Sequence, residues 1–421
     1  MRTKKALVAA VIALFLFIGM SVLLNLYVDG ISVGFTCIIF LLCSVVCVAL
    51  AFVLLGHRFL LRKRTGNSEN CVYFVDRNRK RLRFMLFLGI IAVLVMLLLS
   101  LCCGAAGILS PNKIILALLS AIKKCGQDLT YDEMLVCGSR LPRTLAALAV
   151  GIGLSIAGLI YQAIIRNPLV DPYIMGVSSG AGTAAVAVIA FEFTFFGLFS
   201  SHSSYLIAIA SIVSGLAAFA CTMMLAEKAG GLSVNYVLSG VIVGMAFSAI
   251  QTLMMVMAGH KIANVLTWLY GSFASISWIQ LKFIFVPIIT MSIIPLIWAR
   301  EFNLILFGED QAKQMGLDVK WFNRCMLTYA SVLTSICVSF VGIIGFVGLI
   351  VPHLCRMFIG SDHRMVMPAS IFVGALIMMI ADLISKMMCP GMELPVGAIT
   401  TMVGVPVFIW LFVKKGKMYN G

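Results

Sequence analysis

The sequence predicts an all-α integral membrane protein with about twelve membrane spans. Of its 421 residues, 62% are hydrophobic and 11% are charged, and the mean hydropathy is +1.09. A helix that is apolar on every side needs lipid or other helices around it, so this composition excludes a soluble protein. The apolar residues also gather into runs, and a helix needs roughly 20 such residues to cross a bilayer.

Twelve apolar runs qualify as spans, with an uncertainty of one. The tenth is too short to cross alone unless it tilts or extends through Gly348. The runs cover residues 6–28, 31–56, 84–109, 142–165, 173–191, 205–226, 236–258, 281–299, 325–347, 349–360, 368–388 and 397–413.

Basic residues predict the orientation of these spans. An even number of spans puts both termini on one side, and a cytoplasmic N-terminus leaves most of the 31 Lys and Arg residues in cytoplasmic segments. The net charge of +15 therefore reflects topology and attraction to anionic membrane lipid, and no nucleic-acid partner is predicted. Residues 6–28 resemble a signal peptide, but the run is too long and no small-residue cleavage site follows it. A retained helix is expected.

A basic, polar stretch at residues 57–83 divides the chain by composition. The sequence therefore predicts a two-helix N-terminal membrane addition with a cytoplasmic linker, residues 1–83, and a ten-helix body, residues 84–421. Small residues recur within the body, in GIGLSIAG (151–158), GVSSGAG (176–182) and GFVGLIVP (345–352). Such spacing lets helix backbones approach closely in lipid.

Residues 300–324, REFNLILFGEDQAKQMGLDVKWFNR, form a polar and amphipathic island between long apolar runs. Acidic residues suit the start of a helix and glycine suits its end, so two short helices joined at Gly316 are predicted. The alternative is a solvated loop. The island is a structured cytoplasmic segment in a protein that otherwise lies in the membrane, so another protein could bind there.

Catalytic and metal-binding patterns are missing from the sequence. None of the 13 cysteines forms a CxxC pair, and the five histidines are scattered, so no metal site is predicted. Cys125 and Cys137 share one external loop, where they could pair in an oxidising compartment or remain free. The motifs GxxxxGK[ST] and HExxH are absent, so no catalytic residues and no bound cofactor are predicted. A transport role is favoured over an enzyme role.

Five segments, in this order and spacing, resemble the FecCD-type permease subunits of bacterial ABC importers for iron-siderophores, haem and cobalamin. They are SRLPRTLAALAVGIGLSIAGLIYQ (139–162), RNPLVDPYIMGVSSGAG (166–182), LFGEDQAKQMGL (306–317), GFVGLIVPHLCRMFIGSDHR (345–364) and ELPVGAITTMVGVPVFIWLF (393–412). The resemblance covers about residues 84–418. The first 83 residues have no counterpart in the usual ten-helix members.

This resemblance implies a ten-helix permease, similar to the vitamin B12 permease, in the bacterial cytoplasmic membrane. Its implied partners are a second copy of the permease, two cytoplasmic ATPase subunits that use ATP, and an extracytoplasmic substrate-binding protein. The implied cargo is a metal chelate. Iron-siderophore is favoured as the commonest class, with haem and cobalamin left open.

The resemblance also assigns roles to residues. The island resembles the coupling helices that sit in a groove of the ATPase, and Met315 stands where leucine is usual. Arg140 and Arg143 match arginines that receive acidic residues of the binding protein, and Lys386 matches a third basic position. The alternative makes both arginines ordinary interface anchors. The implied coupling residues are Phe307, Gly308, Glu309, Ala312, Met315, Gly316 and Leu317.

The translocation path is implied to run between two permease copies. Gln162, Asn167 and Ser233 lie at the cytoplasmic ends of helices that match the lining helices, so they are candidate path or gate residues. Asp382 and His353 lie within apolar runs, where an ionisable group is either paired inside the bundle or functional. A structural partner is favoured for Asp382.

Two rival functions stay open. A secondary transporter would carry intramembrane carboxylates or broken helices in repeated halves, and it would not need a cytoplasmic docking island. A membrane-embedded enzyme would need a convergent acid, base and nucleophile. Recovery of an ATPase subunit with the protein would separate both rivals from the importer.

Overall fold

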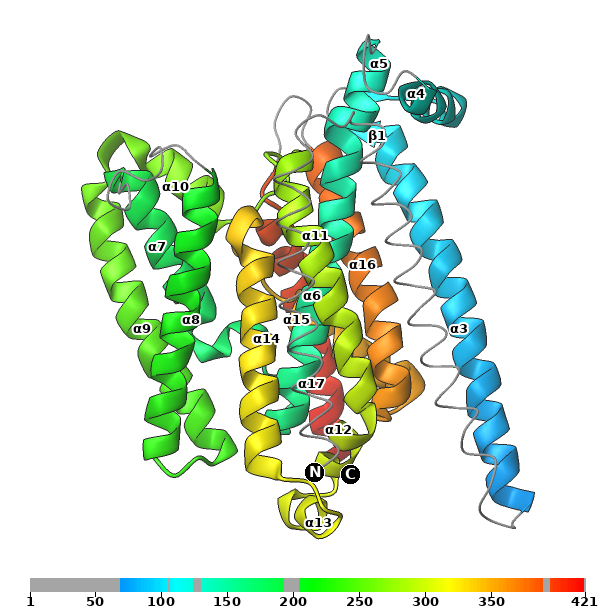
Figure 1. Ribbon diagram of the computed structural model, residues 1–421, viewed down its shortest axis with the longest axis vertical. Coiled ribbons are helices and arrows are strands. Elements are labelled where there is room, and N and C mark those ends of the chain that lie inside the picture. Colours follow the sequence, from blue (N-terminus) through cyan, green and yellow to red (C-terminus); the bar gives the residue numbers. More distant parts are fainter. Residues whose placement is uncertain (1–68, 105–106, 124–129, 193–203, 389–393, 420–421) are drawn as a thin grey trace.

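The computed structural model describes residues 69–419 apart from 105–106, 124–129, 193–203 and 389–393. This part of the chain is almost entirely helical, as Figure 1 shows. The predicted spans 6–28 and 31–56, and with them the two-helix addition, lie outside the described residues. Two short strands, β1 (Cys103–Gly104) and β2 (Gly107–Ile108), pair antiparallel at one end of the bundle.

Each of the ten apolar runs predicted between residues 84 and 413 corresponds to a helix. Seven helical segments in the described part are long and apolar enough to cross a membrane, and α7, α15 and α17 are shorter apolar helices, so the count of twelve spans is not confirmed. The principal helices are α3 (Glu69–Cys102), α6 (Leu141–Ile165), α7 (Val177–Phe191), α8 (Ser204–Lys228), α9 (Ser233–Met257), α11 (Trp278–Ile293), α14 (Val319–Val341), α15 (Val347–Ile359), α16 (His363–Met387) and α17 (Val396–Tyr419).

Short elements join these helices. They are α4 (Pro111–Lys123), α5 (Tyr131–Glu133), the π-helix η1 (Met134–Arg140), η2 (Pro172–Met175), η4 (Gly259–Lys261), α10 (Ile262–Leu269), η5 (Ile294–Trp298), α12 (Ala299–Leu306) and α13 (Glu309–Gln314). In Figure 1, α13 lies at the bottom of the bundle and α10, α4 and α5 lie at the top. These two ends are called the α13 end and the α10 end below.

The predicted linker before residue 84 is helical in its second half. Helix α3 begins at Glu69 and runs without a break through the boundary at residues 83–84. Its 34 residues make a helix about 50 Å long at 1.5 Å per residue. Because a bilayer core is only about 30 Å thick, the basic turns RNRKRLR extend beyond the apolar part of the same helix.

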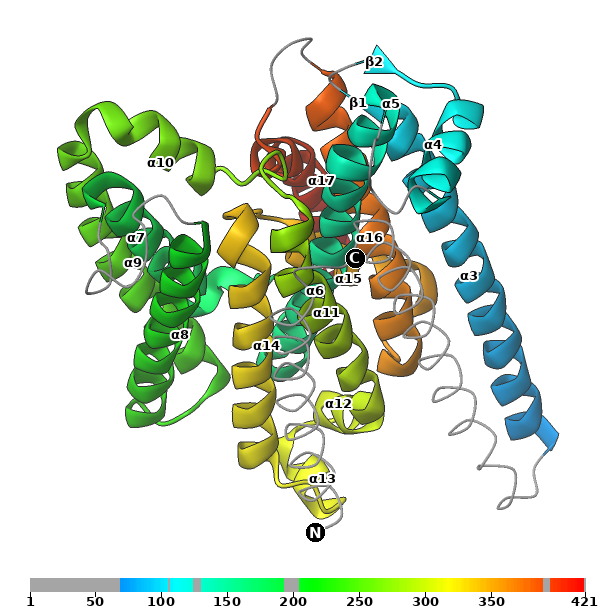
Figure 2. The same cartoon turned by 45° about the horizontal axis from the view of Figure 1, so that its top comes forward.

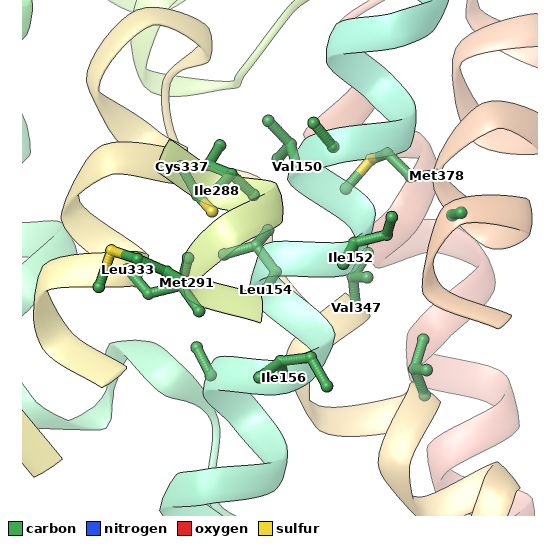
Figure 3. Close-up of a cluster of buried hydrophobic side chains, with 14 of the residues drawn as sticks. Val150, Ile152, Leu154, Ile156, Ile288, Met291, Leu333, Cys337, Val347 and Met378 are labelled. Atoms are coloured by element: carbon green, nitrogen blue, oxygen red, sulfur yellow. The ribbon is translucent and has the colours of Figure 1, made fainter. Parts of the chain in front are cut away.

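Helix α6 forms the centre of the bundle. All but one of its residues are buried, and it packs against α11, α14, α15 and α16. Figure 3 shows α6 side chains such as Leu154 facing Met291 of α11 and Leu333 of α14, with Val347 and Met378 of α15 and α16 on the other side. Lipid provides no hydrophobic force between helices, so this packing depends on close shape complementarity.

The predicted close approach of backbones at the small-residue motifs is confirmed. A Cβ added at Gly158 of α6 would lie 1.9 Å from the carbonyl oxygen of Gly348, at the start of α15. Any side chain at Gly158 would therefore push α15 away from α6.

Helices α7, α8, α9 and α10 pack together as one group, on the left of Figures 1 and 2. At the α10 end, the linker after α10 passes between the end of α14 and the start of α17. The amide of Val396 donates to the carbonyl oxygen of Gly271 at 2.9 Å. Gly342 has a φ of +77°, and a Cβ there would lie 1.9 Å from the carbonyl oxygen of Trp268. We call this meeting of three linkers the linker junction.

Candidate functional site

The predicted island folds as α12, α13 and the first turns of α14 at the α13 end (Figure 1). Glu309 and Asp310 occupy the first turn of α13, where the helix dipole favours acidic residues, as predicted. The predicted helix end is also confirmed, because α13 stops at Gln314 and Gly316 has a φ of +86°.

One part of this prediction is wrong. The segment after Gly316 is not a second short helix but the start of α14, which continues to Val341. The Asp318 carboxylate caps it by accepting a hydrogen bond from the backbone amide of Trp321 at 3.3 Å. The amphipathic turn with Trp321 and Phe322 therefore belongs to a membrane-spanning helix, so α13 is fixed directly to the bundle.

The α13 segment, residues 306–317, has one buried face and one exposed apolar edge. Ala312 is fully buried and Leu317 is 9% exposed, so these two side chains seat the segment on the bundle. In contrast, Leu306, Phe307 and Met315 are 45%, 64% and 58% exposed. We call these three residues the α13 patch. Exposed apolar patches of this kind mark surfaces that contact a protein partner, a ligand or the membrane.

Ion pairs connect the α13 end to neighbouring helices. The Arg166 guanidinium, at the end of α6, donates to the Glu309 carboxylate at 2.9 Å. Arg324 of α14 donates to Glu227 of α8 at 2.9 Å. All four side chains are a third or more exposed, so each pair contributes at most about 1 kcal/mol.

The candidate path residues lie at the α13 end in three different settings. Gln162 is buried, and its side-chain amide donates to the carbonyl oxygen of Leu349 at 3.1 Å and accepts from Arg356. Asn167 is exposed and accepts from the amide of Leu169 at 3.0 Å. Ser233 is half-buried at the start of α9. Gln162 therefore does not line an open path in this structure.

Arg143, Asp382 and Lys386 form a buried charge cluster at the α10 end. The Asp382 carboxylate accepts from Arg143 at 2.8 Å and from the Lys386 ammonium at 2.6 Å. Their side chains are 7%, 0% and 3% exposed. Lys386 also donates to the hydroxyl of Ser100 at 3.1 Å, so the cluster connects α3, α6 and α16. The prediction of a structural partner for Asp382 is confirmed.

Arg140 is buried beside this cluster, where its side chain forms hydrogen bonds with backbone carbonyl groups. Its guanidinium donates to the carbonyl oxygens of Leu101 and Cys102 at 2.7 and 2.8 Å, and to that of Gly107 at 2.7 Å. In this structure Arg140, Arg143 and Lys386 are buried and do not present their charges at the surface, and their role in binding an external protein stays a prediction. The sequence could not show this, because the partners of Arg143 and Lys386 come from distant segments.

Two features of the structure were not predicted from the sequence. Asp171, before η2, accepts hydrogen bonds from the amides of Tyr173, at 2.9 Å, and Phe346, so one carboxylate caps η2 and the turn into α15. Desolvation raises the pKa of Asp171 to about 6, and these two donors limit the rise. The Asp-Pro pair in RNPLVDPY was the available signal, since aspartate before proline favours a turn.

The second missed feature is a pocket of about 340 Å³ at the α10 end, between α10 and the ends of α11 and α14. Hydroxyl and amide groups line much of it, including Asn264, Thr267, Ser272, Gln280 and Ser339. An ion pair between Lys261 and Glu192, at 2.7 Å, also lines it. The serine-rich sequence GSFASIS (271–277) was the available signal.

Metal ligands do not converge in the described residues, where no group of three His, Cys, Asp or Glu side chains could hold an ion. Cys137 is buried and carries a free thiol, and its predicted candidate partner Cys125 lies outside the described residues. His353 is buried in α15.

The sequence matches the FecCD transport family over residues 91–414. The chain belongs to this family. It is 31% identical to the vitamin B12 import system permease protein BtuC of Escherichia coli O6:H1, over 81% of this chain and 98% of the relative. It is 35% identical to the molybdate import system permease protein MolB of Haemophilus influenzae, over 68% of this chain and 84% of the relative. An uncharacterized ABC transporter permease protein of Bacillus subtilis, YvrB, is 34% identical over 69% and 82%.

A solved structure of a metal-chelate type ABC transporter in an inward-facing conformation is similar to this FecCD protein. The TM-score is 0.69 at 30% identity, over 79% of this chain and 99% of that chain. The protein is therefore an ABC importer permease of the FecCD family and a multi-pass membrane protein. Members of this family are transport permeases and are not themselves catalytic enzymes.

Proposed function

We propose that this protein is the membrane subunit of an ATP-driven importer for a metal chelate, and that the α13 patch is where an ATPase subunit binds. The observation that carries the proposal is the pairing of a buried anchor with an exposed apolar edge in the α13 segment, residues 306–317. Ala312 and Leu317 fix the segment, while Phe307 and Met315 are free to fill a groove in a partner. Gly308, Glu309 and Gly316 set the bounds of the helix that presents them.

The orientation follows from the same proposal. The α13 end faces the cytoplasm, and with it both termini, as the distribution of basic residues predicts. ATP binding would draw the two ATPases together and move the α13 segments with them. The membrane path would then switch between two states because the ATPases contact those states differently.

The second permease copy would pack on α9 of the first. Along this helix large apolar side chains are exposed, among them Met245, Leu253 and Val256, at 68%, 68% and 81%. An exposed apolar face on each protomer fits a dimer in which the translocation path lies between the two copies. Asn167 and Ser233 remain candidates for its cytoplasmic end, and Gln162 supports that end from within the protomer.

An external binding protein would meet the α10 end. Because Arg140, Arg143 and Lys386 are buried, we propose that they act there by holding the β1–β2 and α5–η1 segments in place. The partner would contact exposed side chains of those segments, such as Tyr131 and Met134, which are 74% and 60% exposed.

The cargo that we propose is an iron-siderophore, with haem and cobalamin as alternatives. The molybdate permease among the relatives adds a bare oxyanion to the range of candidates, and the B12 permease supports cobalamin as an alternative. Uptake of each candidate into proteoliposomes that contain the whole importer would distinguish them. Uptake without ATP, driven by an ion gradient, would instead identify a secondary transporter.

The coupling assignment is tested by co-purification. Phe307→Asp and Met315→Asp should each abolish recovery of the ATPase with the permease, because a charge replaces an apolar contact at the centre of the interface. Tyr131→Asp is the control, since Tyr131 is also a largely exposed aromatic residue, at 74%, and lies at the opposite end. It should leave ATPase recovery unchanged and weaken binding of the external protein. Full ATPase recovery with both α13 variants would refute the assignment.

A further inference from the structure

Helix α4 lies at the edge of the bundle and has no assigned role. Figures 1 and 2 both show it beside the α10 end of α3, on the side of the molecule away from α7, α8 and α9. It packs on α5, η1 and α3. The Ser120 hydroxyl of α4 contacts the Glu133 carboxylate at 2.5 Å, and Glu133 in turn accepts from the amide of Thr130 at 2.8 Å.

This helix is apolar on two opposite faces. Ile114, Ala117 and Ala121 are buried at 0%, 4% and 5% exposure and form the face toward the protein. At 100° per residue, Ile115, Leu116 and Leu119 point the other way, and they are 48%, 65% and 52% exposed. We call these three residues the outer face of α4. Large apolar side chains that are exposed together on one face are normally covered by lipid or by another protein.

The length and charge of α4 indicate what covers the outer face. Thirteen residues make a helix about 20 Å long, too short to cross a bilayer, and apolar segments of 10–14 residues commonly lie at membrane interfaces. Lysines stand at both ends of this helix, Lys113 in its first turn and Lys123 in its last turn. The exposed Lys113 lies at the flank of the outer face, where a lysine can reach lipid headgroups.

The outer face also continues a lipid-facing surface. Between Arg83 and Cys102, α3 has the highest hydropathy of the spanning segments in the described part of the chain, and only 22% of its apolar window is buried. Its exposed side chains extend to Leu98 and Leu99, one short hairpin before α4. Lipid in contact with Leu98 and Leu99 would therefore also lie next to α4.

We propose that the outer face of α4 lies in the membrane interface at the α10 end, in contact with lipid. The helix would then fix the depth of the α5–η1 segment in the membrane, because Ser120 connects it to Glu133. This inference does not depend on the coupling role of α13.

The test uses the full-length permease in nanodiscs made with a lipid that carries a photoreactive diazirine near its headgroup. After irradiation, peptide mass spectrometry should find lipid adducts on Ile115, Leu116 or Leu119. Adducts on the exposed residues of α3 are the internal positive control. Leu116→Asp should reduce the α4 adducts several-fold, because a carboxylate opposes insertion into the interface. Lys113→Arg, which keeps the flanking positive charge, should leave them nearly unchanged.

Two results would overturn the proposal. One is labelling of α3 with no adducts on α4. The other is labelling of α4 only after residues 1–68 are deleted, which would show that this segment, and not lipid, covers the outer face. Adducts on α4 that are equal with and without residues 1–68 would support lipid contact.

Discussion

Removal of the Asp382 carboxylate should strongly destabilise the protein. Asp382→Asn leaves Arg143 and Lys386 buried, at 7% and 3% exposure, without the carboxylate that contacts both. Loss of one partner from a buried ion pair costs about 3–5 kcal/mol, because the remaining charge cannot recover its hydration. The cost at this site should lie at the upper end of that range, since two cations lose the same partner.

A second variant tests the electrostatic origin of this cost. Lys386→Met removes one cation and keeps the pair between Arg143 and Asp382, so it should cost less than Asp382→Asn. The double variant Asp382→Asn/Lys386→Met should be more stable than Asp382→Asn alone, with a coupling energy of about 0.5–3 kcal/mol.

The free energy of unfolding would be measured by SDS titration in mixed micelles. Glu192→Gln is the matched control, because it breaks an ion pair that is 40–48% exposed and should cost at most about 1 kcal/mol. If Asp382→Asn falls within about 1 kcal/mol of the parent protein, or if the double variant is no more stable than the single one, the cluster does not hold α6 against α16 in the way described.

Three further predictions concern stability in the same titration. Gly342→Ala should cost more than the roughly 1–3 kcal/mol of backbone strain alone, since its methyl group would also overlap a carbonyl oxygen; a cost near zero would mean that the linker junction is not rigid. Tyr161→Phe should cost about 1 kcal/mol, because it removes a buried 2.6 Å hydrogen bond to Ser331, and the loss should shrink in a Ser331→Ala background. Arg324→Gln should change stability by less than about 1 kcal/mol, and a larger effect would show that its exposed pair with Glu227 is part of a stronger network.

The helical part of the fold could be predicted largely from apolar run length. Lipid leaves a spanning segment few alternatives to a helix, because every backbone polar group must be paired within it. The bounds of α13 were also predictable, since Glu309 and Asp310 suit a helix start and Gly316 a helix end. The continuity of α3 across residue 84 was not, because basic side chains do not stop a helix once it is formed.

Burial of the charged residues could not be predicted from the sequence. Two arginines before an apolar run suggested an external surface, but the partner of Arg143 lies 239 residues away in α16. Contacts at such separation depend on how helices pack, and a local pattern does not contain that information. Helix α4 was not predicted for a different reason. Its apolar residues lie on two faces, and it is shorter than a membrane span.

The linker junction and the α13 segment are the two ends of a single helix. Helix α14 begins at Val319, just after the turn at Gly316, and ends at Val341, just before Gly342. Its 23 residues make a rod about 34 Å long with no proline inside. A tilt of about 5° around the junction would therefore displace the α13 patch by about 3 Å. If an ATPase binds the α13 patch as proposed, α14 would transmit its movement through a single straight helix to the linker junction, where three backbone segments meet.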